Sequence, residues 1–574
     1  PVVSPPHTSI TKKAGPSAKA APALGVSPSV LCPPAPSSMV ELSKALDDIG
    51  LGRYQLVQSL IIGGLCMVDG AEILLSSSVL GALQQIWHLS ALTKAFMMSF
   101  IFIGVFIGNL LGGTLADKYG RRTLVLGSYV GLITFGALTA AASGPTDMLI
   151  IRFFFGISYG MGIGPGVGLQ VESAPAAWRG HLLNMGSVFF AVGELYTALL
   201  LLIFMPNLVD PTGHEWRHVT LLDVVPGAVI LPFAFLLLRE SPHYYLMKGK
   251  YDEALEVVKY IAHVNGKEDV LAALESDGGP PELAGPVAAA PGEGTALVQA
   301  GHSSMSHWQQ LRMVFSRDYR SIAIGGSCLC FVANFLFYGL SYGLPQTFSA
   351  MGEEISPAMQ VLIVAFCSFP GVLVSLLLIE SRTIGHRDGM ALLAGFATLL
   401  QLSLITIDLG PNWHWLGLPS AYLSKYVASA FFTLVYVYLG EVFPSVIRCT
   451  GLSVCIACGR FGSMSAPLLF ELLSLLHNPI GPHASFLMFN AALCVLAVLV
   501  IRVCLSYEMK NAPLEDLAAP PACAAGLGAL QPQRRLSLER STPRPSLESD
   551  ALPGAAAAAT TSSAEPVMVA ARAG

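Results

Sequence analysis

The stretch Phe96–Arg122, with the sequence FMMSFIFIGVFIGNLLGGTLADKYGRR, decides the fold class. It begins with roughly 20 mostly apolar residues, which as a helix cross about 30 Å of hydrocarbon. It ends in a charged turn that contains Asp117 and Arg121. An apolar helix that stops at a basic turn is typical of a membrane span at the water boundary. The stretch therefore predicts a membrane-spanning helix.

The same apolar pattern extends along the chain in both directions. Of the 574 residues, 53% are hydrophobic and only 12% are charged, whereas about 25% of the residues of soluble domains are charged. This composition excludes an ordinary soluble enzyme, and a net charge of -5 offers no case for a nucleic-acid partner. Apolar windows predict twelve spans, at 54–78, 92–116, 123–142, 147–170, 181–205, 218–238, 321–346, 357–379, 388–408, 415–440, 446–470 and 484–506.

The Lys and Arg residues predict how these spans are oriented. An even number of spans places both termini on one side of a lipid bilayer. The connections on that side carry Lys118, Arg121 and Arg122 among others, whereas the opposite connections hold only Lys94 and Arg217 near their ends. By the positive-inside rule, both termini are cytoplasmic. We expect a multi-pass, monomeric protein of the plasma membrane or of an intracellular vesicle membrane.

A long loop separates the spans into two groups of six. We expect an N-terminal six-helix bundle at 53–238, a cytoplasmic interdomain loop at 239–320 and a C-terminal six-helix bundle at 321–506. The cytoplasmic tails, 1–52 and 507–574, contain long Pro-, Ala- and Ser-rich stretches, so the first is expected to be disordered and the second mostly so. Within the loop, Tyr251–Val264 has the apolar spacing of an amphipathic helix.

The two groups share a sequence pattern at equivalent positions. The fourth span is followed by the pattern Glu-x-x-Pro-x-x-x-Arg, which is formed by Glu172, Pro175 and Arg179. After the tenth span, the same pattern begins at Glu441 and ends at Arg448. Placement at the same point of each half indicates an internal duplication. Such repeats are typical of transporters in which one half rocks against the other.

The segment Gly113-Thr-Leu-Ala-Asp117-Lys-Tyr-Gly120-Arg121-Arg122 resembles the signature loop of the major facilitator superfamily. Arg239–Leu246 is similar to the motif after the sixth span of its sugar-porter and organic-ion branches, and Asp69-Gly-Ala-Glu72 to the D-x-x-E of synaptic-vesicle-2-related transporters. The resemblance covers residues 40–517 and implies a twelve-helix fold with alternating access. It also implies a conformational latch of charged and glycine residues: Gly113, Asp117, Gly120, Arg121, Arg122, Glu172, Arg179, Glu240, Glu441 and Arg448. The second half departs from the pattern, because Arg382 stands where the acid is expected.

Charged residues inside the predicted spans are the best candidates for function, because ionised groups in a bilayer are costly and usually paired or functional. At 1.5 Å per residue, Asp69 in the first span and Arg152 in the fourth lie at nearly the same depth, about 8 Å from the outer surface. Glu194 lies in the same layer, and Glu72 somewhat further out. We expect Asp69 and Arg152 to pair, as the corresponding residues of proton-coupled sugar porters do by resemblance, with Glu72 and Glu194 as further proton-coupling candidates. The alternative is a purely structural ion pair.

The second half carries buried charges of the opposite sign. Lys425 and Arg460 lie near the middle of their spans, with no acid inside those spans. Two free cations facing a cavity suit a carboxylate or phosphate group. A polar line spaced by four residues in the seventh span adds substrate-binding candidates: Asn334, Tyr338, Tyr342 and Gln346. The alternative is that Lys425 and Arg460 neutralise Glu72 or Glu194 from the other half, which would remove the preference for an anion.

The sequence as a whole predicts a transporter of a small organic solute. Proton-coupled symport of an organic anion is the favoured mechanism, and we expect no cofactor, no metal site and no enzymatic activity. A uniporter of a sugar or an organic cation is the first alternative. A transport-inactive vesicle or receptor protein that keeps the fold is the second.

Overall fold

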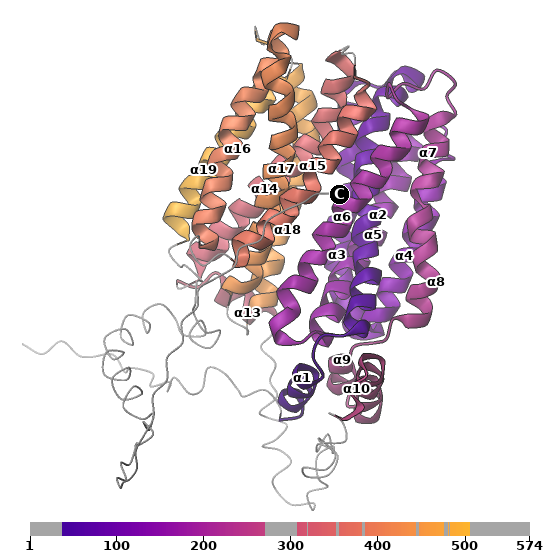
Figure 1. Ribbon diagram of the computed structural model, residues 1–574, viewed down its shortest axis with the longest axis vertical. Coiled ribbons are helices and arrows are strands. Elements are labelled where there is room, and N and C mark those ends of the chain that lie inside the picture. The colour runs from indigo at the N-terminus through magenta and orange to yellow at the C-terminus, as the bar shows by residue number, and fades with distance from the viewer. Residues whose placement is uncertain are drawn as a thin grey trace, which may run out of the picture. The chain divides into compact units, whose positions relative to one another are not determined.

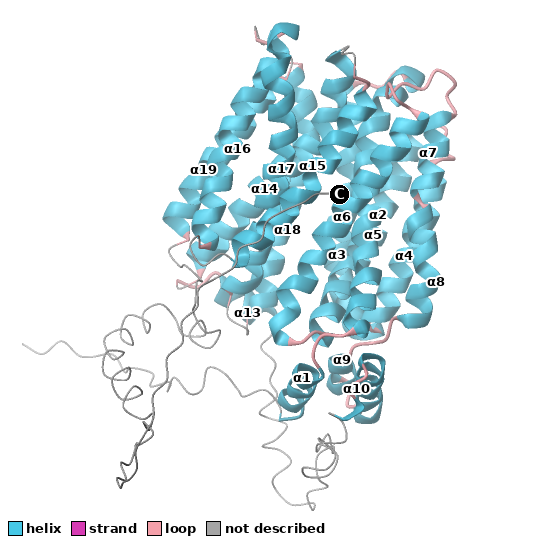
Figure 2. Ribbon diagram, viewed as in Figure 1, coloured by secondary structure: helices cyan, strands magenta, loops and turns pink. Residues whose placement is uncertain are grey.

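The computed structural model describes residues 37–269, 307–317, 319–351, 355–380, 385–443, 447–475, 480–481 and 483–505. The described residues form helices, turns and loops without a strand (Figure 2). Twelve helices are long and apolar enough to cross a membrane. The expected tails up to residue 36 and from 507 onward, and the middle of the interdomain loop, lie outside the described residues.

The predicted spans correspond to helices in both groups. The first group comprises α2 (Arg53–Trp87), α3 (Ala91–Tyr119), α4 (Arg121–Thr139), α5 (Pro145–Ser173), α6 (Arg179–Phe204), α7 (Glu215–Asp223) and α8 (Val225–Leu237). The second comprises α14 (Arg320–Met351), α15 (Pro357–Glu380), α16 (His386–Leu404), α17 (His414–Val442), α18 (Arg448–Ser474) and α19 (Ala484–Cys504). Shorter helices are α1 (Ser37–Ile49), η2 (Ala176–Trp178), α9 (Pro242–Met247), α10 (Tyr251–Asn265), α13 (His307–Val314), η3 (Ile405–Leu409) and η4 (Pro411–Trp413).

The sixth span differs from its prediction because it consists of two helices. α7 ends at Asp223 and α8 begins at Val225. Pro226 in the first turn of α8 has no N–H for a helical hydrogen bond, so the first turn of a new helix suits it. The break places Asp223 in the interior of the first group, where it is buried.

Glycines allow the helices of the first group to cross closely. A Cβ atom on Gly104 or Gly108 of α3 would collide with backbone atoms of α5, and one on Gly156 or Gly160 would collide with α3. Small residues at a crossing let two backbones approach. Gly164, further along α5, has nothing within 4 Å of its Cβ position, so the close crossing does not extend to this glycine.

The first short helix corrects the prediction that residues 1–52 are entirely disordered. Leu42, Leu46 and Ile49 of α1 are buried in one apolar cluster with Val258 and Ile261 of α10. Burial of these apolar side chains stabilises the helix, whereas the sequence before it is rich in Pro and Ala. The predicted amphipathic helix at 251–264 is confirmed as α10.

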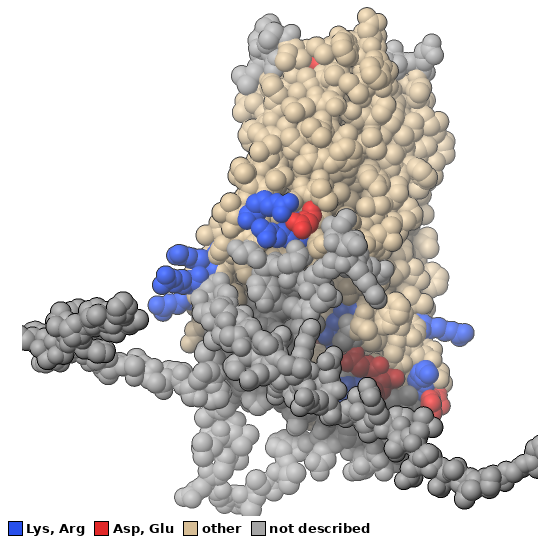
Figure 3. Space-filling model, turned by 60° about the vertical axis from the view of Figure 1, so that its left-hand side comes forward, with Lys and Arg blue, Asp and Glu red and all other residues tan. Residues whose placement is uncertain are grey.

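α1, α9 and α10 lie together below the long helices in Figure 1, and we call this end of the molecule the α9 end. α3 of the first half packs against α18 of the second, and α6 packs against α15. α2 and α14 also contact each other across the same interface. On the face shown in Figure 3, most of the surface is uncharged, and the larger charged groups lie towards the lower edge of the long helices.

Candidate functional site

An ion pair in the middle of the molecule connects the two halves. Nζ of Lys425 in α17 lies 2.7 Å from Oε1 of Glu194 in α6, and both side chains are almost fully buried. The ammonium group also donates to Oγ of Ser341 and lies 3.7 Å from the centre of the Phe337 ring. Lys425 is therefore not the free cation that the sequence favoured. The geometry matches the alternative in which it neutralises Glu194 from the other half.

The second buried cation also faces the other half. Arg460 of α18 interacts electrostatically with Asp69 of α2, Tyr159 of α5 and Tyr338 of α14. Asp69 in turn interacts electrostatically with Tyr159. Nε of Arg460 is buried without a hydrogen-bond partner among the described groups. This guanidinium therefore keeps an unused donor at the interface between the halves.

The predicted pair of Asp69 and Arg152 needs correction. Arg152 of α5 lies 3.4 Å from Oε1 of Glu72, and Ser76 hydrogen-bonds both the Arg152 guanidinium and this carboxylate. Asp69 and Glu72 differ by less than one turn of α2, so depth along the helix alone does not select between them. The pairing depends on the face of α2 on which each acid lies, and Glu72 lies on the face that meets Arg152.

A further carboxylate completes this group inside the first half. Asp223 at the end of α7 is buried, accepts a hydrogen bond from Thr197 and interacts electrostatically with Glu72 and Arg152. The sequence did not single out Asp223, because one unbroken sixth span was expected at 218–238. The Val-Val-Pro sequence directly after Asp223 is the signal that would have predicted the helix break.

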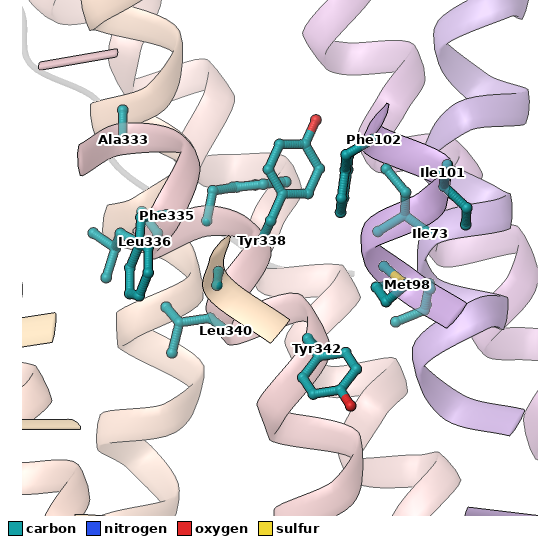
Figure 4. Close-up of a cluster of buried hydrophobic side chains, with 14 of the residues drawn as sticks. Ile73, Met98, Ile101, Phe102, Ala333, Phe335, Leu336, Tyr338, Leu340 and Tyr342 are labelled. Carbon is teal, nitrogen blue, oxygen red and sulfur yellow. The ribbon is translucent and has the colours of Figure 1, made fainter. Parts of the chain in front are cut away.

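The polar line of α14 does not border one open cavity but meets a different partner at each turn. Asn334 donates to the hydroxyl of Tyr436 at 3.0 Å, and Tyr342 donates to Oε1 of Glu471 at 2.6 Å. Tyr338 extends towards the first half, where its ring centre lies 4.8 Å from that of Phe102 (Figure 4). Tyr338 and Gln346 therefore contact the first half, whereas Asn334 and Tyr342 are bonded to residues of the second half.

A second cross-half ion pair lies at the end of the molecule opposite to the α9 end. Nζ of Lys94, in the first turn of α3, lies 2.9 Å from Oε1 of Glu471 near the end of α18. Oε1 of Gln346 accepts a hydrogen bond from the same ammonium group at 3.2 Å. The N–H of Ala358 donates to the carbonyl of Pro206 across the same interface. These contacts hold the two halves together at this end.

The predicted latch residues of the first half lie together at the α9 end. Arg121 lies 3.2 Å from Glu172 of α5 and 3.7 Å from Asp117 of its own turn. Glu240 accepts hydrogen bonds from the backbone N–H groups of Arg121 and Arg122 at 2.9 and 3.0 Å, and so caps the start of α4. Burial raises the pKa of the Glu240 carboxyl, against the effect of the hydrogen bonds from Ser241, Arg122 and Arg121.

Gly120 is needed at this turn for two reasons. Its φ of +95° lies in the region that favours glycine, and a Cβ atom there would collide with the Glu240 carboxylate.

Gly113 and Arg179 are the remaining predicted latch residues of the first half. Gly113 has open space around its Cβ position, and Arg179 donates to the carbonyl of Ala174 at 3.2 Å. The side chains of Glu441, Arg448, Glu380 and Arg382 lie outside the described part of the second half.

The described residues contain no group of three or more His, Cys, Asp or Glu side chains that could hold a metal ion. What the site offers is a set of buried acid–base pairs, two of which join the halves. Such pairs can form, break and exchange partners when the halves move.

Comparison with known families agrees with this architecture. Residues 69–519, well over half of the chain, match the family described as "Sugar (and other) transporter". The chain belongs to the sugar (and other) transporter family. This family consists of membrane transporters of the major facilitator superfamily rather than enzymes, so this family member is a transporter of small solutes.

Its relatives carry several different names. The chain is 27% identical over 451 residues to the synaptic vesicle 2-related protein of Rattus norvegicus, which covers 75% of each protein. It is also 27% identical over 507 residues to organic cation/carnitine transporter 7 of Arabidopsis thaliana, covering 83% of this chain and 96% of that protein. The solved structure of the proton:xylose symporter XylE, a protein from E. coli, matches with a TM-score of 0.62 and 18% identity over 81% of this chain and 98% of that one. That likeness shows the twelve-helix fold of this family transporter.

Proposed function

We propose that this transporter moves a small organic anion together with a proton by alternating access. The observation that carries the proposal is the buried pair of Lys425 and Glu194, whose two members belong to different halves. A buried cation needs an anionic partner, because an uncompensated charge in a dry site costs several kcal/mol. The carboxylate of a solute can take the place of Glu194.

Proton coupling follows from this exchange of partners. When the solute carboxylate binds Lys425, the displaced Glu194 carboxylate is left in an apolar surrounding, and a proton neutralises it. Release of the solute on the other side frees Lys425 for Glu194, which then loses its proton. Anion and proton are therefore bound and released together.

The other candidate residues fit around this step. Asp69, Glu72 and Arg152 remain proton-coupling candidates, with Asp69 opposite Arg460 and with Glu72 held by Arg152. Arg460 is the second candidate cation for the solute, since Nε has an unused donor. Hydrogen bonds to the solute are proposed for the polar residues of α14, which are Asn334, Tyr338, Tyr342 and Gln346.

Alternating access requires that the contacts at the two ends open in turn. Lys94 and Glu471 must separate for the solute to enter from the end opposite to α9. At the α9 end, the predicted latch around Arg121 and Glu172 would change as the halves move. By the positive-inside rule we propose that the α9 end and both termini are cytoplasmic. A monomer in the plasma membrane or in a vesicle membrane is proposed as the working form.

A specific observation also favours a second candidate, an organic cation or zwitterion. Inside the first half, two buried carboxylates, Glu72 and Asp223, interact with one buried cation, Arg152. The excess of one acid suits a cationic group on the solute. The relative from Arabidopsis thaliana bears the name organic cation/carnitine transporter 7.

The test is uptake into proteoliposomes that contain the full-length protein, with and without an inward proton gradient. The panel comprises an aromatic acid, a dicarboxylate, phosphate, a hexose and an organic cation. We expect an anion to accumulate only with the gradient, and Glu194→Gln to abolish accumulation while exchange of anion for anion persists. Glu253→Gln, an exposed position in α10, is the matched control. Gradient-independent uptake of the cation or hexose would contradict the proposal in favour of uniport, and no uptake of any solute would contradict it in favour of a transport-inactive protein.

A further inference from the structure

The second half carries a group of arginines at the α9 end that the transport mechanism does not use. This arginine group consists of Arg312, Arg317, Arg320, Arg387 and Arg502. Three contacts join the elements that carry Arg320, Arg387 and Arg502, while α13, which carries Arg312, packs against α18, and the N–H of Arg320 donates to the carbonyl of Ser316 beside Arg317. Oγ of Ser321, next to Arg320, donates to the carbonyl of Cys504 at 3.0 Å, and the Arg387 guanidinium donates to the carbonyls of Ile501 and Arg502 at 3.2 and 2.9 Å. The start of α14, the start of α16 and the end of α19 therefore meet at one place.

Among the described side chains, the positive charge of this group exceeds the negative charge beside it. Arg502 pairs with Asp388 at 2.8 Å, and both side chains are about half exposed. Arg312, Arg317 and Arg320 are exposed and have no carboxylate within ion-pair distance among the described side chains. Figure 3 turns this side of the molecule forward and shows basic side chains on it, with an acidic group beside one of them.

Apolar side chains are exposed next to the arginines. Trp308 of α13 is 78% exposed, Phe315 is 49% exposed and Val503 of α19 is 74% exposed. Arg320 and Arg502 stand in the terminal turns of two candidate membrane spans. The group therefore lies where the apolar surface of the spans ends. Trp residues and basic side chains at that depth are typical of the boundary between hydrocarbon and headgroups.

We propose that this arginine group binds the headgroups of anionic phospholipids. Arginine forms paired hydrogen bonds with phosphate oxygens, and its planar guanidinium is suited to this contact. Clusters of four to eight basic residues beside a membrane helix attract anionic lipids, at about 1 kcal/mol per residue near the surface. The exposed side chains of Trp308 and Phe315 offer an apolar surface to the acyl chains of the same lipid. The proposal is independent of the transported solute.

At the same end, basic side chains of the first half are bonded to other groups of the protein. There Arg121 pairs with Glu172, and the Arg122 guanidinium donates to the carbonyls of Leu238 and Phe235. These basic groups are used inside the protein, whereas Arg312, Arg317 and Arg320 are directed to the surroundings. The lipid site is accordingly proposed for the second half alone.

The experiment compares lipid binding by the full-length protein in phosphatidylcholine bilayers. Spin-labelled phosphatidylglycerol and spin-labelled phosphatidylcholine are added in turn, and electron spin resonance measures the fraction of each that is immobilised at the protein. We expect the wild-type protein to prefer phosphatidylglycerol by about tenfold at low salt, which corresponds to about 1.4 kcal/mol, and to lose most of this preference in 1 M salt. The triple variant Arg312→Gln, Arg317→Gln and Arg320→Gln is expected to lose the preference at low salt as well.

Matched variants make the test specific. Arg53→Gln, Lys248→Gln and Lys267→Gln together remove three exposed cations of α2 and of the loop that follows the first half at the same end, and are expected to leave the preference unchanged. If the first triple variant does not fold, the single variants Arg317→Gln and Arg320→Gln are each expected to show a partial loss. No preference in the wild-type protein, an equal loss in both triple variants, or displacement of the labelled lipid by millimolar glycerol 3-phosphate would overturn the proposal. The last result would indicate a site for a soluble phosphate instead.

Discussion

The two halves of the molecule share a fold but treat their buried charges differently. In the first half, Arg152 is held by Glu72 and Ser76 from the same half, and Asp223 stands beside them. In the second half, Lys425 is neutralised by Glu194 and Arg460 faces Asp69, and both acids belong to the first half. In the middle of the molecule, the first half therefore satisfies its cation internally, whereas the second half depends on its partner. Lys94 of the first half, which pairs with Glu471 of the second, lies at the end opposite to the α9 end.

This difference separates two roles that a buried ion pair can have. A pair inside one half moves with that half and persists through a rocking motion. A pair between halves exists only while the halves are close at that level, so its members must find other partners in the rest of the cycle. The comparison predicts that Arg152, besides its proposed place among the proton-coupling candidates, supports the structure of its half. It predicts exchangeable contacts for Lys425 and Arg460, and each prediction can be tested.

The largest effect is expected from breaking the internal pair. Arg152→Met leaves Glu72 and Asp223 without a cation in a dry surrounding, and removing one partner of a buried pair costs about 3–5 kcal/mol. Lys425→Met is expected to cost less, because Glu194 borders a small cavity at the interface between the halves. Thermal unfolding in detergent compares the two variants, with Arg53→Met at an exposed position as control. An equal drop in melting temperature for Arg152→Met and Lys425→Met would remove the distinction between the halves.

The second effect concerns Asp69, which faces Arg460 across the interface. We expect Asp69→Asn to abolish accumulation driven by a proton gradient and to spare exchange of solute across the membrane, because asparagine keeps the shape of the side chain but cannot take up a proton. Gradient-driven uptake and counterflow in the same proteoliposomes provide the two measurements. Loss of both activities, or of neither, would sink the assignment of Asp69 to proton coupling.

A smaller effect is expected at the cross-half pair opposite to the α9 end. Lys94→Gln removes the ion pair with Glu471, and a loss of about 1.4 kcal/mol from the closed form would raise the population of the form open at this end about tenfold. The rate at which an impermeant thiol reagent labels Thr347→Cys, a buried position on α14, measures this population. Lys94→Arg keeps the positive charge and is expected to label slowly. Equal labelling rates for Lys94→Gln and Lys94→Arg would show that the pair does not hold this end closed.

The smallest effect is a pH dependence at the α9 end of the first half. Burial raises the pKa of Glu240 above its ordinary value of 4.5. An acid with a raised pKa in the folded protein stabilises it fully below its ordinary pKa, and this stabilisation is lost as the pH rises through the folded value. The wild-type melting temperature should therefore fall with rising pH above about 4.5 by more than that of Glu240→Gln. Parallel pH profiles of the two proteins would show that Glu240 does not contribute in this way.

Most of the fold could be predicted from the sequence, because apolar windows of sufficient length have few alternatives to membrane helices. All twelve predicted spans correspond to described helices or helix pairs. The break at Val224 was missed, since a hydropathy window averages over a single residue between two helices. The helix at Ser37–Ile49 was also missed, because its apolar side is buried only against α10, which follows about two hundred residues later in the chain.

The sequence predicted which charged residues of the candidate site are buried, but not which of them meet. A rise of 1.5 Å per residue predicts Asp69, Arg152 and Glu194 in one layer, and in the structure each is buried and has a different partner. Which acid meets which cation depends on the faces of the helices, and these are set by packing such as the glycine crossing of α3 and α5. The partner of Lys425 lies 231 residues earlier in the chain, a distance at which sequence spacing carries no information on contact.

The pairing of Lys425 with Glu194 has a consequence for the electrical behaviour of the transporter. With the pair closed, the ammonium and the carboxylate cancel. With a monovalent anion on Lys425 and a proton on Glu194, the site is again neutral. A membrane potential of 100 mV does about 2.3 kcal/mol of work on each elementary charge that crosses the field, but neither form of this site presents a net charge to it. If transport follows the proposed exchange, its rate will follow the pH difference across the membrane and ignore the voltage.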